Sequence, residues 1–316
     1  MRLATLTGGT RRRGFTLLEV LIGTLVLALL VALLSQMLGR VSGVWQQGHA
    51  QVEKSEGGRA ILEFMARELQ AAMVPVNRTT GTNSLQLVVN PTHISDKYKN
   101  SDAIFWQAPL ATDQTLGDIA EFGYFVKWDT ATNAQIPKAL LCRFFVNPGT
   151  DYTADSNYLI LTTPTAWISD TILDTVAPAD ATTNTNAAYQ GLFVENVLGL
   201  WITCLDAVGN TITQNGGSDA FDSRKGYSYT DSGGNAVVLS GCALPAAIDV
   251  SFVLLDSRSA NRITPALQSI IAALTADTSI KNADQFVRAA LNQGTLKPIQ
   301  SGLRPCMTRV YLQNSK

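Results

Sequence analysis

The most constraining feature of this chain is an apolar run that begins at Phe15, directly after three arginines and a glycine, and ends near Leu34. At about 1.5 Å of rise per helical residue, the run is long enough to cross the ~30 Å hydrocarbon core of a bilayer. One carboxylate, Glu19, interrupts it. A charge inside a membrane helix costs roughly 2.5–3.5 kcal/mol on insertion scales and usually marks function. The pattern therefore predicts a transmembrane helix over residues 15–35 in which Glu19 has a special role.

Two simpler explanations of this run are a secretory signal peptide and a plain signal anchor. A cleavable signal peptide has a shorter apolar core, of about 7–15 residues, and a small-residue cut site after it. No such site follows Leu34, because the next residues continue the helical pattern. A plain anchor explains the length and the arginines but not Glu19. Since only basic charges precede the run, the N-terminus is expected to stay cytoplasmic while the rest is exported.

The stretch Arg11-Arg12-Arg13-Gly14-Phe15-Thr16-Leu17-Leu18-Glu19 resembles the prepilin signal of type IV pilins and type II secretion pseudopilins. The resemblance implies that residues 1–14 are a leader peptide, cut between Gly14 and Phe15 by a membrane prepilin peptidase. It also implies N-methylation of Phe15. In a filament of such proteins, the amine of the first mature residue can pair with the Glu19 carboxylate of a neighbouring subunit. We expect this pair to set the axial stagger of the subunits, because a buried ion pair can fix register.

Helical character continues through residues 36–74, which we interpret as a stalk running into an exported head. Gly39, Gly43, Gly48 and the pair Gly57-Gly58 weaken this helix by about 1 kcal/mol each relative to Ala. The segment from Arg59 to Met73 is amphipathic, and Pro75 ends it. Its apolar positions recur at helical spacing and form one face: Ile61, Leu62, Met65, Leu69, Ala72 and Met73.

Residues 75–316 change to short strands separated by turn signals, which predicts an exported globular domain. The fold class is therefore α+β: a long N-terminal helix, transmembrane in its first half, packed on an antiparallel β-sheet head with inserted loops and short helices. Residues 175–188 are expected to form a long surface loop, and 264–291 two helices with Pro265 at the first start and Asn282 as the second cap. The expected strands are 84–89, 103–106, 119–128, 139–146, 159–161, 192–205, 236–239, 247–255 and 308–312.

Three segments of the head resemble the minor pseudopilin J family more closely. They are Val194–Asp206 with a turn at Gly209, Leu244–Asp256, and Arg309–Leu312. The size of the head favours the same family, because major pilins are usually smaller. The loop at 175–188 and the helices at 264–291 depart from the core pilin pattern.

All four cysteines, Cys142, Cys204, Cys242 and Cys306, lie in the expected exported part. In an oxidising compartment they could form two disulfides, with three connectivities that the sequence does not distinguish. We expect at least one disulfide; four buried free thiols are the alternative. A zinc site is not expected, because the cysteines include no C-x-x-C pair and have no nearby pair of histidines.

The chain lacks the common enzyme motifs G-x-S-x-G, H-E-x-x-H, G-x-G-x-x-G and the P-loop. No cofactor is expected. A calcium ion bound by the acidic Gly/Ser/Asn-rich stretch from Gly216 through Asn235 stays open, although that stretch does not follow the order of an EF-hand loop. Removing residues 1–14 would take four of the 24 basic residues and none of the 25 acidic ones. The mature chain would then be mildly acidic, so specific nucleic-acid binding is not predicted.

These features favour a non-enzymatic structural subunit, a minor pseudopilin or pilin of a type II secretion or type IV pilus-like filament. Its expected partners are prepilin peptidase, other pseudopilins or pilins, the bacterial inner membrane, and a secreted substrate at the filament tip. The expected location is the inner membrane, single-pass, with the head in the periplasm or outside the cell. The alternatives are an adhesin or DNA-uptake minor pilin and, from another class, a signal-anchored periplasmic enzyme.

Overall fold

The computed structural model describes residues 17–73, 85–112, 117–129, 136–148, 167–177, 191–214 and 220–313. The chain divides into two compact units, Met1–Glu53 and Lys54–Lys316, and helix α1 (Leu17–Gln70) contributes to both. In the first unit, the large apolar side chains that the structure describes between Leu17 and Met37 are exposed. Phe15 and Thr16, where the predicted span begins, lie outside the described residues. Within the described part of the chain, no helix has the length and apolar character that crossing a membrane requires.

In the second unit, the last turns of α1 pack on the sheets of the head. The amphipathic face expected there is confirmed: Leu62, Met65, Leu69 and Ala72 are buried in the main core, while Glu63, Arg67 and Gln70 are exposed. The helix continues through Gly57-Gly58. Gly58 is buried against the last strand, where an added Cβ would lie 2.5 Å from the Cys306 Sγ atom.

A six-stranded antiparallel sheet forms one layer of the head. Its order is β5 (Leu192–Glu195), β4 (Lys138–Val146), β3 (Ala120–Asp129), β2 (Ala103–Ala108), β1 (Leu87–Val89) and β7 (Phe221–Asp222). Every residue of β2 and nearly every residue of β3 is buried. Both faces of this sheet are therefore covered.

Each face of the six-stranded sheet has its own hydrophobic cluster. One face packs with α1 and the second sheet, through residues such as Trp106, Phe122 and Tyr124. The other face, which includes Phe105, Phe125 and Phe144, is covered by η1 (Asp96–Tyr98) and α3 (Asp170–Val176). Ser169 caps α3 by accepting a hydrogen bond from the Ile172 N–H at 3.4 Å.

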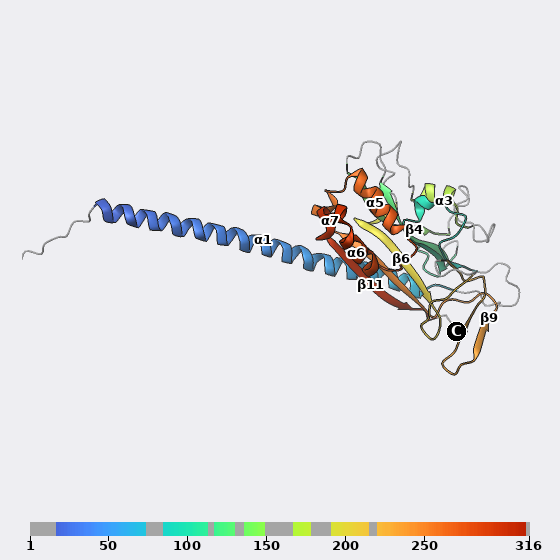
Figure 1. Ribbon diagram of the computed structural model, residues 1–316. Helices are drawn as coiled ribbons and strands as arrows, with labels where there is room; N and C mark the ends of the chain where they lie inside the picture. The colour runs from blue at the N-terminus through green and yellow to red at the C-terminus, as the bar shows by residue number, and fades with distance from the viewer. Residues whose placement is uncertain are drawn as a thin grey trace, which may run out of the picture. The chain divides into compact units, whose positions relative to one another are not determined.

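A three-stranded antiparallel sheet has the order β11 (Leu303–Tyr311), β10 (Ala247–Leu255) and β6 (Val197–Leu205). Figure 1 shows α5 (Pro265–Thr275), α6 (Ala283–Asn292) and α7 (Lys297–Gln300) gathered beside these strands. A hydrogen bond of 3.1 Å from the Ala283 N–H to the Ser251 Oγ joins α6 to β10. The remaining short elements of this region are α4 (Ser257–Ala260) and η3 (Gly294–Leu296). A separate hairpin pairs β8 (Tyr227–Thr230) with β9 (Ala236–Leu239).

The single strand expected over 192–205 is wrong, because Asn196 divides it. Asn196 has a positive φ of 65°, a left-handed conformation that ends one strand and redirects the next. As a result β5 pairs with β4 in the six-stranded sheet, whereas β6 pairs with β10 in the three-stranded sheet. A single residue therefore moves the chain from one sheet to the other.

The expected α+β fold class is confirmed, and so are the helix start at Pro265 and the cap of α6 at Asn282; the N-cap of α5 is Thr264. The last strand begins at Leu303, earlier than the expected 308. Pro305 lies inside it, which an edge strand tolerates because no neighbour needs its missing N–H.

Within the expected loop at 175–188, Thr175 and Val176 belong to α3; residues 178–188 and the strand expected at 159–161 lie outside the described residues.

Candidate functional site

The candidate site for assembly is the start of α1, and the structure describes only part of it. Gly14 and Phe15 lie outside the described residues, while Glu19 lies in the first turns of α1. The helix that follows exposes Leu, Ile and Val side chains in every direction, with exposed fractions from 50 to 84% between Leu17 and Leu34. Such a surface is far more apolar than that of a typical soluble protein and needs a covering partner.

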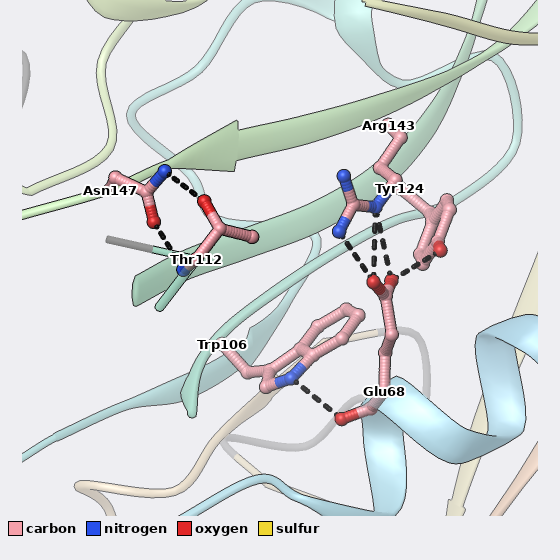
Figure 2. A network of polar contacts seen from close by, with 6 residues as sticks. All are labelled: Glu68, Trp106, Thr112, Tyr124, Arg143 and Asn147. Atoms are coloured by element: carbon pink, nitrogen blue, oxygen red, sulfur yellow. Dashed lines mark hydrogen bonds and ion pairs between the residues drawn. The ribbon is translucent and has the colours of Figure 1, made fainter. Parts of the chain in front are cut away.

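A polar network fastens the other end of α1 to the six-stranded sheet, as Figure 2 shows. The Glu68 carboxylate lies on the buried face of the helix and accepts hydrogen bonds from the Arg143 guanidinium, with Nε 3.1 and 3.2 Å from its two oxygens. The Tyr124 hydroxyl donates to the same carboxylate at 2.5 Å. The Trp106 indole N–H donates to the Glu68 main-chain oxygen at 3.2 Å. One residue from each of the strands β2, β3 and β4 thus forms a hydrogen bond with the same helix residue, Glu68.

The charges of this network are balanced inside the head. Burial and then the Glu68 carboxylate raise the pKa of Tyr124 well above its ordinary value, which keeps the phenol neutral. Burial alone would lower the pKa of Arg143, but the hydrogen bonds and charge of Glu68 outweigh it and raise that pKa. The guanidinium carbon also lies 4.5 Å from the centre of the Phe145 ring, a cation–π distance. We call the four residues Glu68, Trp106, Tyr124 and Arg143 the Glu68 clamp, because their hydrogen bonds attach α1 to the sheet.

The sequence pattern alone does not predict this clamp, although it contains one signal of it. Glu68 falls between Met65 and Leu69 on the apolar face of an amphipathic helix, where a carboxylate needs a buried partner. What the pattern could not supply was the partner, because Arg143 lies on a strand distant in the sequence. Figure 2 also shows a second polar pair, in which Asn147 accepts from the Thr112 N–H at 2.9 Å.

The expectation of at least one disulfide is wrong in this structure: all four cysteines are free. They lie on separate elements and in different environments. Cys142 is buried in the cluster under α3, and Cys204 in the main core. Cys306 lies against Gly58 of α1, and Cys242 in a turn with a φ of 51°. Burial raises the pKa of Cys142 to about 11, and it also raises those of Cys204 and Cys306.

Among the described residues, no group of three or more His, Cys, Asp or Glu side chains is placed to hold a metal ion. Part of the acidic stretch considered for calcium, residues 216–219, lies outside the described residues. The described carboxylates of that stretch serve turns. Asp231 accepts from the N–H groups of Gly233 and Asn235, at 2.9 and 2.7 Å, and Asp222 accepts from the Arg224 N–H at 3.0 Å.

Comparisons with known proteins give two matches. Residues 9–35 match the prokaryotic N-terminal methylation motif. Over 76 residues the chain is 41% identical to the type II secretion system protein J of Xanthomonas campestris pv. campestris. That match covers 24% of this chain and only 36% of the relative's length. No solved structure matches the chain. These matches confirm the resemblance to prepilins and to J-type pseudopilins.

Proposed function

We propose that this chain is a minor, J-like pseudopilin, a non-enzymatic subunit of a type II secretion filament. The observation that carries the proposal is the match of residues 9–35 to the methylation motif, a segment that includes Gly14, Phe15 and Glu19. The similarity to a type II secretion protein J favours the secretion system over a pilus.

In this function the chain begins as an inner-membrane precursor. Prepilin peptidase cuts after Gly14 and the new N-terminus, Phe15, is methylated. The arginines before the cut keep this end in the cytoplasm, so the head lies in the periplasm. The apolar surface of α1 is then covered by lipid before assembly and by neighbouring subunits' helices in the filament.

Glu19 guides the step from membrane to filament. Its carboxylate pairs with the amine of Phe15 on an adjacent subunit, and the pair is favourable only at the correct stagger, since an unpaired charge in an apolar bundle is costly. The head then contributes contacts to other minor pseudopilins or to the secreted substrate. The Glu68 clamp supports this role, because it ties α1 firmly to the sheet of the head.

Mass spectrometry of the protein purified from its native membranes tests the processing. We expect a mature chain that begins with N-methylated Phe15. A chain that still begins with Met1, in cells with active prepilin peptidase, would contradict the proposal and favour a plain signal anchor.

Assembly is tested by comparing Glu19→Ala with Glu63→Ala. Glu63 is exposed on the same helix and makes only a surface pair with Arg59, at 2.8 Å, so its loss is a matched control for removing a carboxylate. We expect Glu19→Ala to be processed normally but lost from cross-linked filament fractions, and Glu63→Ala to be incorporated like the natural protein. Equal incorporation of both variants would show that Glu19 has no assembly role.

A further inference from the structure

Strand β11 leaves one edge of the three-stranded sheet open. It is the last strand of that sheet, and its register with β10 on the inner side is continuous. Beyond one end of the strand, the Leu312 N–H donates to the Ala246 carbonyl at 3.1 Å. Beyond the other end, the Asp256 N–H donates to the Gly302 carbonyl at 3.2 Å. Because the main-chain groups of alternate residues point to the same side, the even-numbered residues of β11 face β10 and the odd-numbered ones face outward.

The outward main-chain groups of β11 form a row of donors and acceptors. Within the described part of the chain, the N–H and C=O groups of Met307, Arg309 and Tyr311 on this side have no hydrogen-bond partner. Pro305 ends the row, because a proline has no N–H to donate. The opposite edge of the same sheet, on β6, is instead closed by hydrogen bonds with neighbouring segments. An edge strand with unpaired groups is a template for pairing with another chain.

Helix α1 does not occupy the place beside this edge. It crosses one face of the sheet, since an added Cβ on Gly58 would lie close to both Cys306 of β11 and Leu254 of β10. The outward-facing residues have their side chains on the other face, where Met307 is 52% and Tyr311 65% exposed. A second chain can therefore reach the edge and pack against these two side chains.

The charge that could guard this edge is held back. Edge strands often prevent unwanted pairing with a charged side chain. Arg309 lies in the middle of the open row, but its guanidinium donates to the Asp249 carboxylate of β10, at 2.7 and 2.8 Å. The Arg309 side chain is still 44% exposed. A carboxylate that faced Arg309 from a further strand would extend this row of opposite charges, which is favourable across neighbouring strands.

We propose that the outer edge of β11 binds an extended segment of a partner protein, in which an acidic residue lies between two apolar ones at alternate positions. In antiparallel orientation the acidic residue exchanges two main-chain hydrogen bonds with Arg309, and the apolar residues do the same with Met307 and Tyr311. A second β11 does not fit this description, because the strand contains no acidic residue. The site rests on the proposed role of the head in contacting partners, but it needs neither processing nor Glu19.

The test uses the full chain in mild detergent and the peptide Thr-Val-Thr-Glu-Thr-Val-Thr, with an N-terminal fluorescein and a C-terminal amide. Fluorescence anisotropy measures its affinity. N-methylation of the valines and the glutamate removes the donors that face β11, so this form should bind about tenfold more weakly. N-methylation of the three inner threonines and the last one alters only groups that point away, and this form should bind like the parent peptide. Lysine in place of the glutamate should weaken binding about fivefold.

Two variants of one residue locate the site on the protein. Met307→Pro removes one outward N–H, at a position in phase with Pro305, which the strand already contains. Met307→Leu keeps the N–H and is the matched control. We expect Met307→Pro to weaken binding about tenfold and Met307→Leu to leave it unchanged. Urea denaturation checks that both variants are folded, and the two methylated peptides test the natural chain if Met307→Pro is not.

The proposal is overturned if the parent peptide does not bind, if the two methylated peptides bind equally, or if the two folded Met307 variants bind alike. It is also overturned if the natural chain is a dimer by sedimentation and Met307→Pro makes it a monomer, since a second copy would then occupy the edge. Peptide binding by a chain that fails the Phe15 and Glu19 tests would remove the filament role and keep the site on β11.

Discussion

At the scale of single residues, the ion pair between Glu68 and Arg143 attaches α1 to the six-stranded sheet. The side chain of Glu68 is 10% exposed and that of Arg143 26% exposed, so the pair is only slightly hydrated. Removing one member leaves a charge without its partner in a poorly solvated place. Its position on α1 makes this pair the main polar attachment of the helix to the sheet.

We predict that Glu68→Gln lowers the free energy of unfolding by about 2–3 kcal/mol, somewhat less than for a fully buried pair because Arg143 keeps some contact with water. Glu63→Gln on the same helix should cost less than about 0.5 kcal/mol, since its pair with Arg59 is exposed. Urea denaturation of both variants checks this. Equal losses in the two variants would mean that the clamp adds nothing beyond a surface pair.

Tyr124 should give the head an alkaline limit of stability. Its pKa is raised in the folded protein, so above pH 10 the phenol ionises in the unfolded chain but stays neutral in the folded one. The unfolded state is therefore increasingly favoured as the pH rises. Ionisation of Tyr124 lowers the free energy of unfolding by up to about 1.4 kcal/mol per pH unit. Urea denaturation between pH 9 and 11 should give a shallower decline for Tyr124→Phe. Parallel curves for the two proteins would contradict this explanation.

The four thiols should differ in reactivity. Cys142, Cys204 and Cys242 are buried, whereas Cys306 is partly exposed. Because thiolates react and burial disfavours them, we predict that Ellman's reagent modifies at most one cysteine in the native protein, namely Cys306. Cys306→Ser should remove this reaction, and unfolding in urea should expose the remaining thiols. Fast modification of several cysteines without denaturant would show a more open head.

At the scale of elements, Asn196 decides where two strands go. Its positive φ turns the chain between β5 and β6, and its N–H donates to the Ala139 carbonyl at 2.7 Å. The backbone conformation matters more than the side chain here, because Asn and Gly adopt it readily and β-branched residues do not.

We predict that Asn196→Val costs about 1–2 kcal/mol of stability, the strain of a β-branched residue at positive φ, while Asn196→Gly costs little. Urea midpoints of the two variants test the difference. If Val is tolerated as well as Gly, the turn between the two sheets does not depend on this conformation.

At the scale of the whole molecule, the second unit has the components of an independent domain. Residues Lys54–Lys316 contain both hydrophobic clusters, and α1 contributes Leu62, Met65 and Leu69 to one of them. We predict that a fragment comprising residues 54–316 is monomeric in solution and unfolds in one cooperative transition. Removing residues up to Met73 instead should abolish this transition, because the core then loses its helix. Aggregation of the longer fragment would contradict this prediction.

The sequence by itself was enough for features that depend on local patterns. The motif around Gly14, Phe15 and Glu19, the amphipathic face of residues 59–73, the helix start at Pro265, the cap at Asn282 and the strands at 236–239 and 247–255 all follow from spacing and residue type. The tertiary structure alone decided which sheet receives β5 and which receives β6, that Glu68 meets Arg143 and Tyr124, and that the cysteines stay apart. Those outcomes depend on contacts between residues far apart in the chain, which local periodicity does not encode.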